Sequence, residues 1–112
     1  MRFPRAHRLT RRTEFERVLR QRGVRIVSGA FVALALPNAM TGARLGMIIG
    51  KRHLPRAVDR NRIKRAIRES FRRHWVDLPK IDVVIQLAGK AQREDARAAL
   101  ADIWPRLART SA

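Results

Sequence analysis

The sequence predicts an α+β fold in which three helices pack against one four-stranded sheet. Apolar residues recur at helical spacing in three segments, and they alternate or run continuously in four shorter segments, as in strands. Glycine and proline separate these segments. The order of elements is α-β-β-β-α-β-α, which is typical of helices packed on a single sheet. With 112 residues, we expect residues 1–112 to form a single domain.

The N-terminal segment predicts a basic arm followed by a short helix. Residues 1–12 contain Pro4 and several arginines but no acid, so we expect an irregular basic N-terminal arm. Thr13 and Glu16 have the spacing of a capping box. In such a box the Thr side chain accepts a hydrogen bond from the backbone N–H of the Glu, and the Glu side chain accepts one from the backbone N–H of the Thr. Gly23 is expected to end this helix.

Four segments are expected to form strands because they are rich in β-branched and other apolar residues and are bounded by turn residues. In the third of them, Gly46 and Gly50 leave one face bare, which lets a ligand or another part of the chain approach closely. The predicted strands are residues 24–27, 30–36, 44–49 and 81–87.

Two further helices are predicted in the second half of the chain. One covers about residues 58–75 and follows a basic loop that ends near Pro55. The other begins after Gly89 and is expected to end or kink at Trp104-Pro105, because the residue before a proline disfavours the helical conformation.

The charge is unusually positive and unevenly distributed. The formal net charge is +17, and residues 1–73 hold 20 of the 26 basic but only 4 of the 9 acidic residues. Such a balance is typical of proteins that neutralise phosphate backbones. Cysteine is absent, which excludes disulfides, thiolate metal sites and a cysteine nucleophile. With neither a membrane-spanning apolar run nor a secretory signal, we expect a cytoplasmic protein.

The predicted helix over 58–75 has one apolar and one strongly basic face. Guanidinium groups match phosphate oxygens in a bidentate manner, and like charges at helical spacing repel one another unless a polyanion neutralises them. A merely solvated face is the alternative, but such a surface would mix both signs. We therefore predict a nucleic-acid-binding helix. Around Asn61, its basic residues are Arg60, Arg62, Lys64, Arg65, Arg68, Arg72 and Arg73.

The segment Arg60-Asn61-Arg62 with its flanks resembles the signature of the bacterial ribonuclease P protein subunit. The likeness extends to Lys51-Arg52 before it and to residues 68–72 after it. Residues 45–47 and 78–82 are similar to the family's third strand and to the entry to its fourth. The resemblance covers nearly the whole chain.

This resemblance implies a function in tRNA maturation. Ribonuclease P is an endoribonuclease that removes the 5′ leader of precursor tRNA, and its catalytic subunit is an RNA that holds the active-site Mg²⁺. The implied partners are this RNA and precursor tRNA, with no obligate protein partner, no membrane, and no cofactor or metal bound by the protein itself. The family also implies a left-handed β-α-β crossover, against the usual handedness rule.

The resemblance also assigns candidate site residues, none of them catalytic. Leu19 and Leu34 depart from aromatic residues that many or some members have at these positions, so leader binding is expected to rest more on apolar packing and phosphate contacts. The implied leader-binding residues are Phe15, Leu19 and Phe31. The implied RNA-binding residues are Lys51, Arg52, Arg56, Arg60, Asn61, Arg62, Lys64, Arg65, Arg68 and Arg72.

Other functions are less well supported by the sequence. His7, His53 and His74 are far apart and have no clustered carboxylates, so neither a metal site nor an acid–base pair is predicted. A DNA reader would need a helix and a short turn before its basic helix, whereas a strand and a loop precede this one. A structural RNA-binding protein of the ribosomal type, with no role in tRNA processing, stays the alternative.

Overall fold

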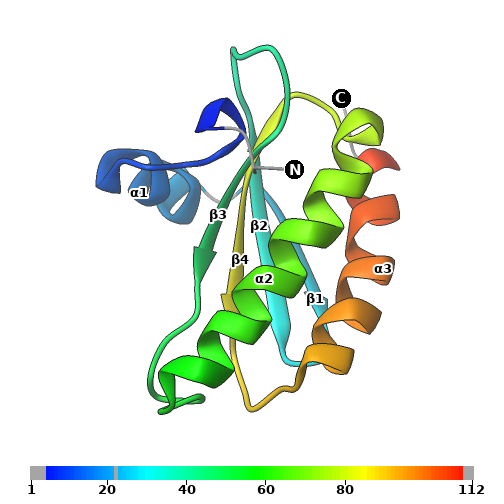
Figure 1. Ribbon diagram of the computed structural model, residues 1–112. Helices are drawn as coiled ribbons and strands as arrows, with labels where there is room; N and C mark the ends of the chain where they lie inside the picture. The colour runs from blue at the N-terminus through cyan, green and yellow to red at the C-terminus, as the bar shows by residue number, and fades with distance from the viewer. Residues whose placement is uncertain (1–4, 22, 110–112) are drawn as a thin grey trace.

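The computed structural model describes residues 5–21 and 23–109. Residues 1–4, part of the predicted arm, lie outside the described residues, as do residues 22 and 110–112. The predicted order of helices and strands is confirmed (Figure 1). The helices are α1 (Arg12–Gln21), α2 (Ala57–His74) and α3 (Arg93–Arg109), with 3-10 helices η1 (Arg5–His7) and η2 (Trp75–Asp77); the strands are β1 (Val24–Ser28), β2 (Phe31–Pro37), β3 (Arg44–Ile48) and β4 (Ile81–Leu87).

The four strands form one mixed sheet in the order β1-β2-β4-β3. Strand β2 pairs antiparallel with both β1 and β4, whereas β3 pairs parallel with β4. Helix α2 connects the two parallel strands. In Figure 1 both strands run downward, α2 lies in front of the sheet, and β4 lies to the right of β3. This arrangement is a left-handed crossover, as the family resemblance implies.

The larger core lies between the sheet and the pair α2 and α3, which cover the same face (Figure 1). Trp104 of α3 is buried there and packs edge-to-face on Phe71 of α2, with ring centroids 5.7 Å apart. Its indole Nε1 donates to the hydroxyl oxygen of Ser70 at 2.7 Å. The two helices are thus joined by apolar packing and by one partly buried hydrogen bond, which satisfies the only polar atom of the indole.

Helix α1 lies alone on the other face of the sheet, over a smaller apolar cluster. Val18 is the only fully buried residue of α1. It packs with Leu9, Leu36 and Val84, while Phe15 and Leu34 lie at the margin of the cluster. This side of the sheet therefore holds its helix with much less buried apolar surface than the α2 and α3 side.

The described part of the N-terminal arm packs against the sheet. Its first residues form η1, and the backbone N–H of Leu9 donates to the C=O of Leu45 at 2.9 Å, next to a parallel bridge between Arg8 and Leu45. The ring of His7 stacks on Trp75, with centroids 4.1 Å apart. An isolated bridge and ring stacking thus hold the arm in place, while residues 9–11 form neither helix nor strand.

The start of α1 also differs from the predicted capping box. The helix begins at Arg12, and it is Glu14 that accepts hydrogen bonds from the backbone N–H groups of Thr10 and Arg11, at 3.0 and 2.9 Å. Glu16 instead pairs with the side chain of Arg12 at 2.9 Å. Glu14 occupies the third helical position, where a carboxylate reaches back to the free N–H groups, so the helix begins two residues earlier than predicted and Glu14 supplies the carboxylate half of a capping box.

Helix α3 does not end at Trp104-Pro105 but continues through Pro105 to Arg109. Trp104 and Leu107, on either side of the proline, are both buried in the main core. Their burial outweighs the one backbone hydrogen bond that proline cannot donate. None of the helices in the described part of the chain is long and apolar enough to cross a membrane.

Candidate nucleic-acid interface

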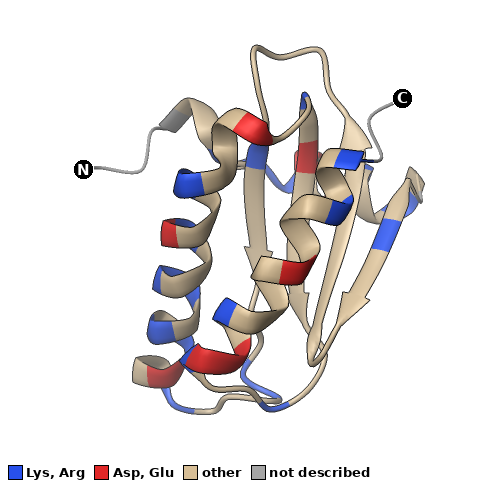
Figure 2. Ribbon diagram, turned by 90° about the vertical axis from the view of Figure 1, so that its right-hand side faces the viewer, with Lys and Arg blue, Asp and Glu red and all other residues tan. Residues whose placement is uncertain are grey.

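Helix α2 presents its basic residues on the side that faces away from the sheet (Figure 2). Its other side is anchored by Ile63, Ile67 and Phe71, which are buried in the main core. Because this anchor fixes the helix, the charged positions have fixed spacings. Asn61, Arg62, Arg65, Arg72 and Arg73 are exposed, whereas Arg60, Lys64 and Arg68 are partly buried.

Most of these cations have no acidic partner in the described part of the chain. The one ion pair recorded at this helix joins Arg56 to Asp59, at 3.7 Å. No carboxylate oxygen of a described residue lies within ion-pair distance of the remaining basic side chains of α2. Their mutual repulsion is therefore not relieved within the protein, and a polyanion would relieve it.

The basic loop before α2 is tied to the first turn of the helix. Leu54 buries its side chain, and Arg60 donates through Nη1 to the backbone C=O groups of Leu54 and Pro55, both at 2.8 Å. Lys51, Arg52 and Arg56 remain exposed beside the positive N-terminal end of the helix. Arg60 thus fixes the loop, while the neighbouring cations stay available for a ligand.

A pocket of about 650 Å³ lies where α1, the edge strand β3 and α2 meet. It brings Phe15, predicted to bind a single strand, together with Lys64 and Arg68, predicted to bind RNA. Phe15 fills the strand face that the sequence leaves bare, because a Cβ added at Gly46 would lie 2.5 Å from Cε1 of Phe15. The lining residues are Arg8, Leu9, Phe15, Leu45, Gly46, Met47, Lys64 and Arg68.

Two other residues predicted for the leader groove are placed differently. Leu19 lies partly buried on α1, one turn after Phe15, but it does not line the pocket. Phe31 is 0% exposed and belongs to the core under α2 and α3. Because side chains alternate along β2, its side chain points to the face opposite α1. A leader-binding role for Phe31 is therefore wrong.

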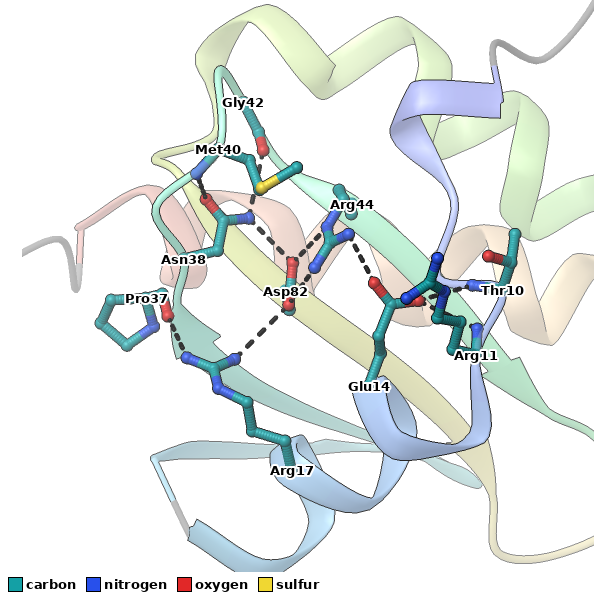
Figure 3. A network of polar contacts seen from close by, with 10 residues as sticks. All are labelled: Thr10, Arg11, Glu14, Arg17, Pro37, Asn38, Met40, Gly42, Arg44 and Asp82. Atoms are coloured by element: carbon teal, nitrogen blue, oxygen red, sulfur yellow. Dashed lines mark hydrogen bonds and ion pairs between the residues drawn. The ribbon is translucent and has the colours of Figure 1, made fainter.

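A polar network that the sequence did not predict joins α1 to the sheet (Figure 3). At its centre is Asp82 of β4, which is 1% exposed. Arg44 donates to it in a bidentate manner, from Nε at 2.9 Å and from Nη2 at 2.8 Å, and its Nη1 donates to Oε2 of Glu14 at 2.7 Å. Asn38 also donates to the Asp82 carboxylate, at 2.8 Å, and Arg17 approaches it at 3.5 Å.

The network favours the ionised forms of Glu14 and Arg44. The backbone N–H of Arg11 lowers the pKa of Glu14 below its ordinary value of 4.5; partial burial opposes this shift, and the N–H of Thr10 and the Arg44 guanidinium add to it. The hydrogen bond to Asp82 raises the pKa of Arg44 above its ordinary value, with smaller support from Glu14. One sequence signal could have indicated this network: Asp82 is a single acid within the apolar strand 81–87 of a strongly basic chain.

Histidines and carboxylates do not gather at the basic surface. Within residues 5–21 and 23–109, no group of three or more potential ligand side chains is placed to hold a metal ion. His74 bonds through Nδ1 to the C=O of Ser70 at 2.9 Å, and His53 lies partly buried in the basic loop. What the basic surface and the pocket beside it offer a ligand is therefore positive charge and the aromatic ring of Phe15.

The ribonuclease P family model matches residues 3–110, nearly the entire chain. The chain belongs to the ribonuclease P protein family. The members of this family are the protein subunits of ribonuclease P, a tRNA-processing enzyme. The resemblance carried by Arg60-Asn61-Arg62 and its flanks is thereby confirmed.

Ribonuclease P protein components of several bacteria are similar to this chain. That of Marinobacter nauticus is 36% identical over 108 residues, which are 94% of this chain and 81% of the relative. That of Chromobacterium violaceum is 40% identical over 114 residues, covering 99% and 93% of the two chains. That of Halorhodospira halophila is 42% identical over 106 residues, covering 92% and 87%.

Solved ribonuclease P proteins have the same fold. The Staphylococcus aureus protein superimposes with a TM-score of 0.78 at 27% identity, covering 89% of this chain and 94% of that one. The Thermotoga maritima protein gives a TM-score of 0.74 at 27% identity, covering 94% and 98%. The three helices and mixed four-stranded sheet are therefore those of ribonuclease P proteins.

The lowered pKa of Glu14 predicts a specific dependence of stability on pH. Its carboxylate stabilises the folded state above pH 4.5, and this contribution is lost as the pH falls through the lowered folded-state pKa, because the unfolded chain binds the proton first. In urea unfolding from pH 7 to pH 3, the stability difference between wild type and Glu14→Gln should shrink toward acid. Glu16→Gln, which removes a carboxylate paired with the exposed Arg12, controls for the lost charge. A difference that stays constant with pH would contradict the role of Glu14.

Proposed function

We propose that this chain is the RNA-binding subunit of a ribonuclease P holoenzyme that removes the 5′ leader of precursor tRNA. The exposed face of α2 and the loop before it bind the catalytic RNA. The pocket at Phe15 receives the single-stranded leader. The protein acts in the cytoplasm and needs no obligate protein partner.

One observation carries this proposal: the unpaired cations of α2 lie next to a pocket with an aromatic wall. Single-stranded nucleic acids are held by cations that follow the backbone and by aromatic rings on which bases stack. Phe15 provides the ring, while Lys64 and Arg68 line the same pocket. Arg62, Arg65 and Arg72 point outward, where a second RNA surface can reach them. The precursor's leader and the catalytic RNA would thus meet along α2.

We assign cleavage and Mg²⁺ binding to the RNA subunit, as the family resemblance implies, and no cofactor to the protein. The protein's contribution is electrostatic. Its cations neutralise phosphates of both RNAs where they approach each other, which lessens the repulsion that Mg²⁺ would otherwise have to screen. A structural RNA-binding role outside tRNA processing is not favoured, because the chain matches the ribonuclease P family over residues 3–110.

Reconstitution tests this division of labour. The purified protein with Mg²⁺ should leave precursor tRNA intact, because we place the cleaving groups on the RNA. Adding the protein to the catalytic RNA should restore correct 5′ cleavage at a Mg²⁺ concentration too low for the RNA alone. Correct cleavage by RNA-free protein, or no effect of the protein on the RNA at low Mg²⁺, would refute the proposal.

Binding to the catalytic RNA should weaken steeply as salt is raised. If about five phosphate contacts form along α2 and its loop, the slope of log affinity against log salt should be about −4 to −5, by analogy with duplex DNA. Arg65→Ala should make this slope shallower by about one unit. Arg25→Ala, at an exposed position of the distant strand β1, should leave it unchanged. A flat salt dependence would show that the basic face is only solvated surface.

Phe15→Ala should weaken binding of leader-bearing precursor while sparing mature tRNA. Base stacking on an aromatic ring contributes about 1–3 kcal/mol, so the affinity for precursor should fall roughly 5- to 150-fold. Val18→Ala, which removes buried volume from the same helix away from the pocket, is the control and should act on stability alone. If Phe15→Ala lowers the melting temperature but binds both RNAs equally per folded molecule, Phe15 is a core residue instead.

A further inference from the structure

The position of α1 over the sheet is set by polar contacts as well as by apolar ones. Val18 is its only fully buried side chain, and the apolar cluster beneath it is small. Apolar packing is also non-directional, so it leaves the helix free to slide between neighbouring positions. The polar network around Asp82 adds directional contacts to two positions of the helix, Glu14 and Arg17.

These contacts reach α1 through a short and rigid chain of groups. Asp82 lies on β4, an interior strand of the sheet. Its carboxylate accepts hydrogen bonds from Nε and Nη2 of Arg44 on the neighbouring strand β3. The third nitrogen of Arg44 then holds Glu14 at 2.7 Å. Arg17 is fixed at the same end of the sheet, where its Nη2 donates to the C=O of Pro37 at 2.9 Å. Figure 3 shows these side chains converging on Asp82.

The ion pair between Glu14 and Arg44 also fixes where Phe15 lies. Glu14 and Phe15 are consecutive on α1, and their partners Arg44 and Gly46 are two residues apart on β3. Residues two apart on a strand share a face, so both partners point toward α1. Gly46 is the position at which Phe15 packs so closely that no Cβ fits. If α1 shifted along β3, the same movement would break the ion pair and take the Phe15 ring away from Gly46.

Burial of an ion pair is poor evidence for stability, because desolvation offsets most of the attraction. A network in which one carboxylate accepts from Arg44, Asn38 and Arg17 does, however, select one arrangement of the segments that it joins. Within the described surface, that arrangement decides whether Phe15 faces Lys64 and Arg68 across the pocket. The network therefore affects the shape of the pocket without touching a ligand in it.

We propose that Asp82, acting through Arg44 and Glu14, is a positioning residue for leader binding: it sets the place of the Phe15 ring over the pocket. This inference rests on the proposed function, because it takes Phe15 as the leader's stacking platform. The further point is that the preference for leader-bearing precursor over mature tRNA depends on a buried carboxylate that does not itself line the pocket. Loss of Asp82 should then act on precursor tRNA through Phe15 and should leave the surface of α2 intact.

A double-mutant cycle in the reconstituted holoenzyme tests this positioning role. The measured quantity is the ratio of the dissociation constants for mature tRNA and leader-bearing precursor. Phe15→Ala and Asp82→Asn should each lower this ratio about tenfold, within the range that loss of one stacking contact gives. The double variant should also lower it about tenfold rather than a hundredfold, because the two changes remove the same contact. Affinity for the catalytic RNA should stay within about twofold of wild type.

Two further variants keep the experiment decisive. Glu14→Gln leaves the Asp82–Arg44 pair in place and removes the carboxylate that joins Arg44 to α1 and accepts the N–H groups of Thr10 and Arg11, while Arg17 still joins α1 to Asp82. It serves if Asp82→Asn does not fold, and it should lower the ratio in the same non-additive way. Asp102→Asn is the matched control, because it removes an aspartate from an exposed ion pair with Arg106 on α3 and should change nothing.

The possible failures are distinguishable. If Phe15→Ala itself leaves the ratio unchanged, the leader site of the proposed function is wrong. If Phe15→Ala lowers the ratio but Asp82→Asn and Glu14→Gln do not, only the positioning role is overturned. A double variant whose losses add, or equal weakening toward both tRNAs, would mean that Asp82 acts on general stability and not through Phe15.

Discussion

Burial of the apolar stripe of α2 is the interaction on which the rest of the structure depends. Ile63, Ile67 and Phe71 fix the helix against the sheet and α3, and this fixed helix carries cations that repel one another. A free helix with the same sequence would relieve the repulsion by unfolding. Here the core keeps the cations at fixed spacings, so that a polyanion meets them already arranged and little conformational freedom is lost on binding.

The features that follow from one-dimensional periodicity could be predicted from the sequence. The four strands form where apolar and β-branched residues were expected to build them, and β2 is buried on both faces, as its continuous apolar run predicts. The basic face of α2 is opposite its apolar stripe because both follow from the helical repeat. The left-handed crossover was different, since the general rule predicts the other hand and only the family resemblance indicated it. The sequence could not show that Lys64 and Arg68 share a pocket with Phe15, because that depends on how α1 and α2 flank β3.

Packing decides several points that the local sequence pattern leaves open. Phe31 has the aromatic character of a stacking residue, but the pairing of β2 with β1 and β4 places it on the face under α2 and α3. Pro105 would end an isolated helix, yet Trp104 and Leu107 bury enough surface to carry α3 past it. Asp82 looked like one polar residue of an alternating strand. Its partners come from three other segments of the chain, namely α1, the turn after β2, and β3, which no local pattern could bring together.

The pairing of the N-terminal arm with β3 covers only part of that strand. The arm bonds at Leu45, and beyond it the edge continues to Met47, which borders the pocket. An open strand edge tends to pair with the edge of another molecule, and flanking charge is one of the ways in which proteins prevent this. Around this edge lie Lys64 and Arg68, and a second copy would bring the same positive charges against them. The cations that attract RNA therefore also keep copies of the protein apart and protect an exposed sheet edge from aggregation.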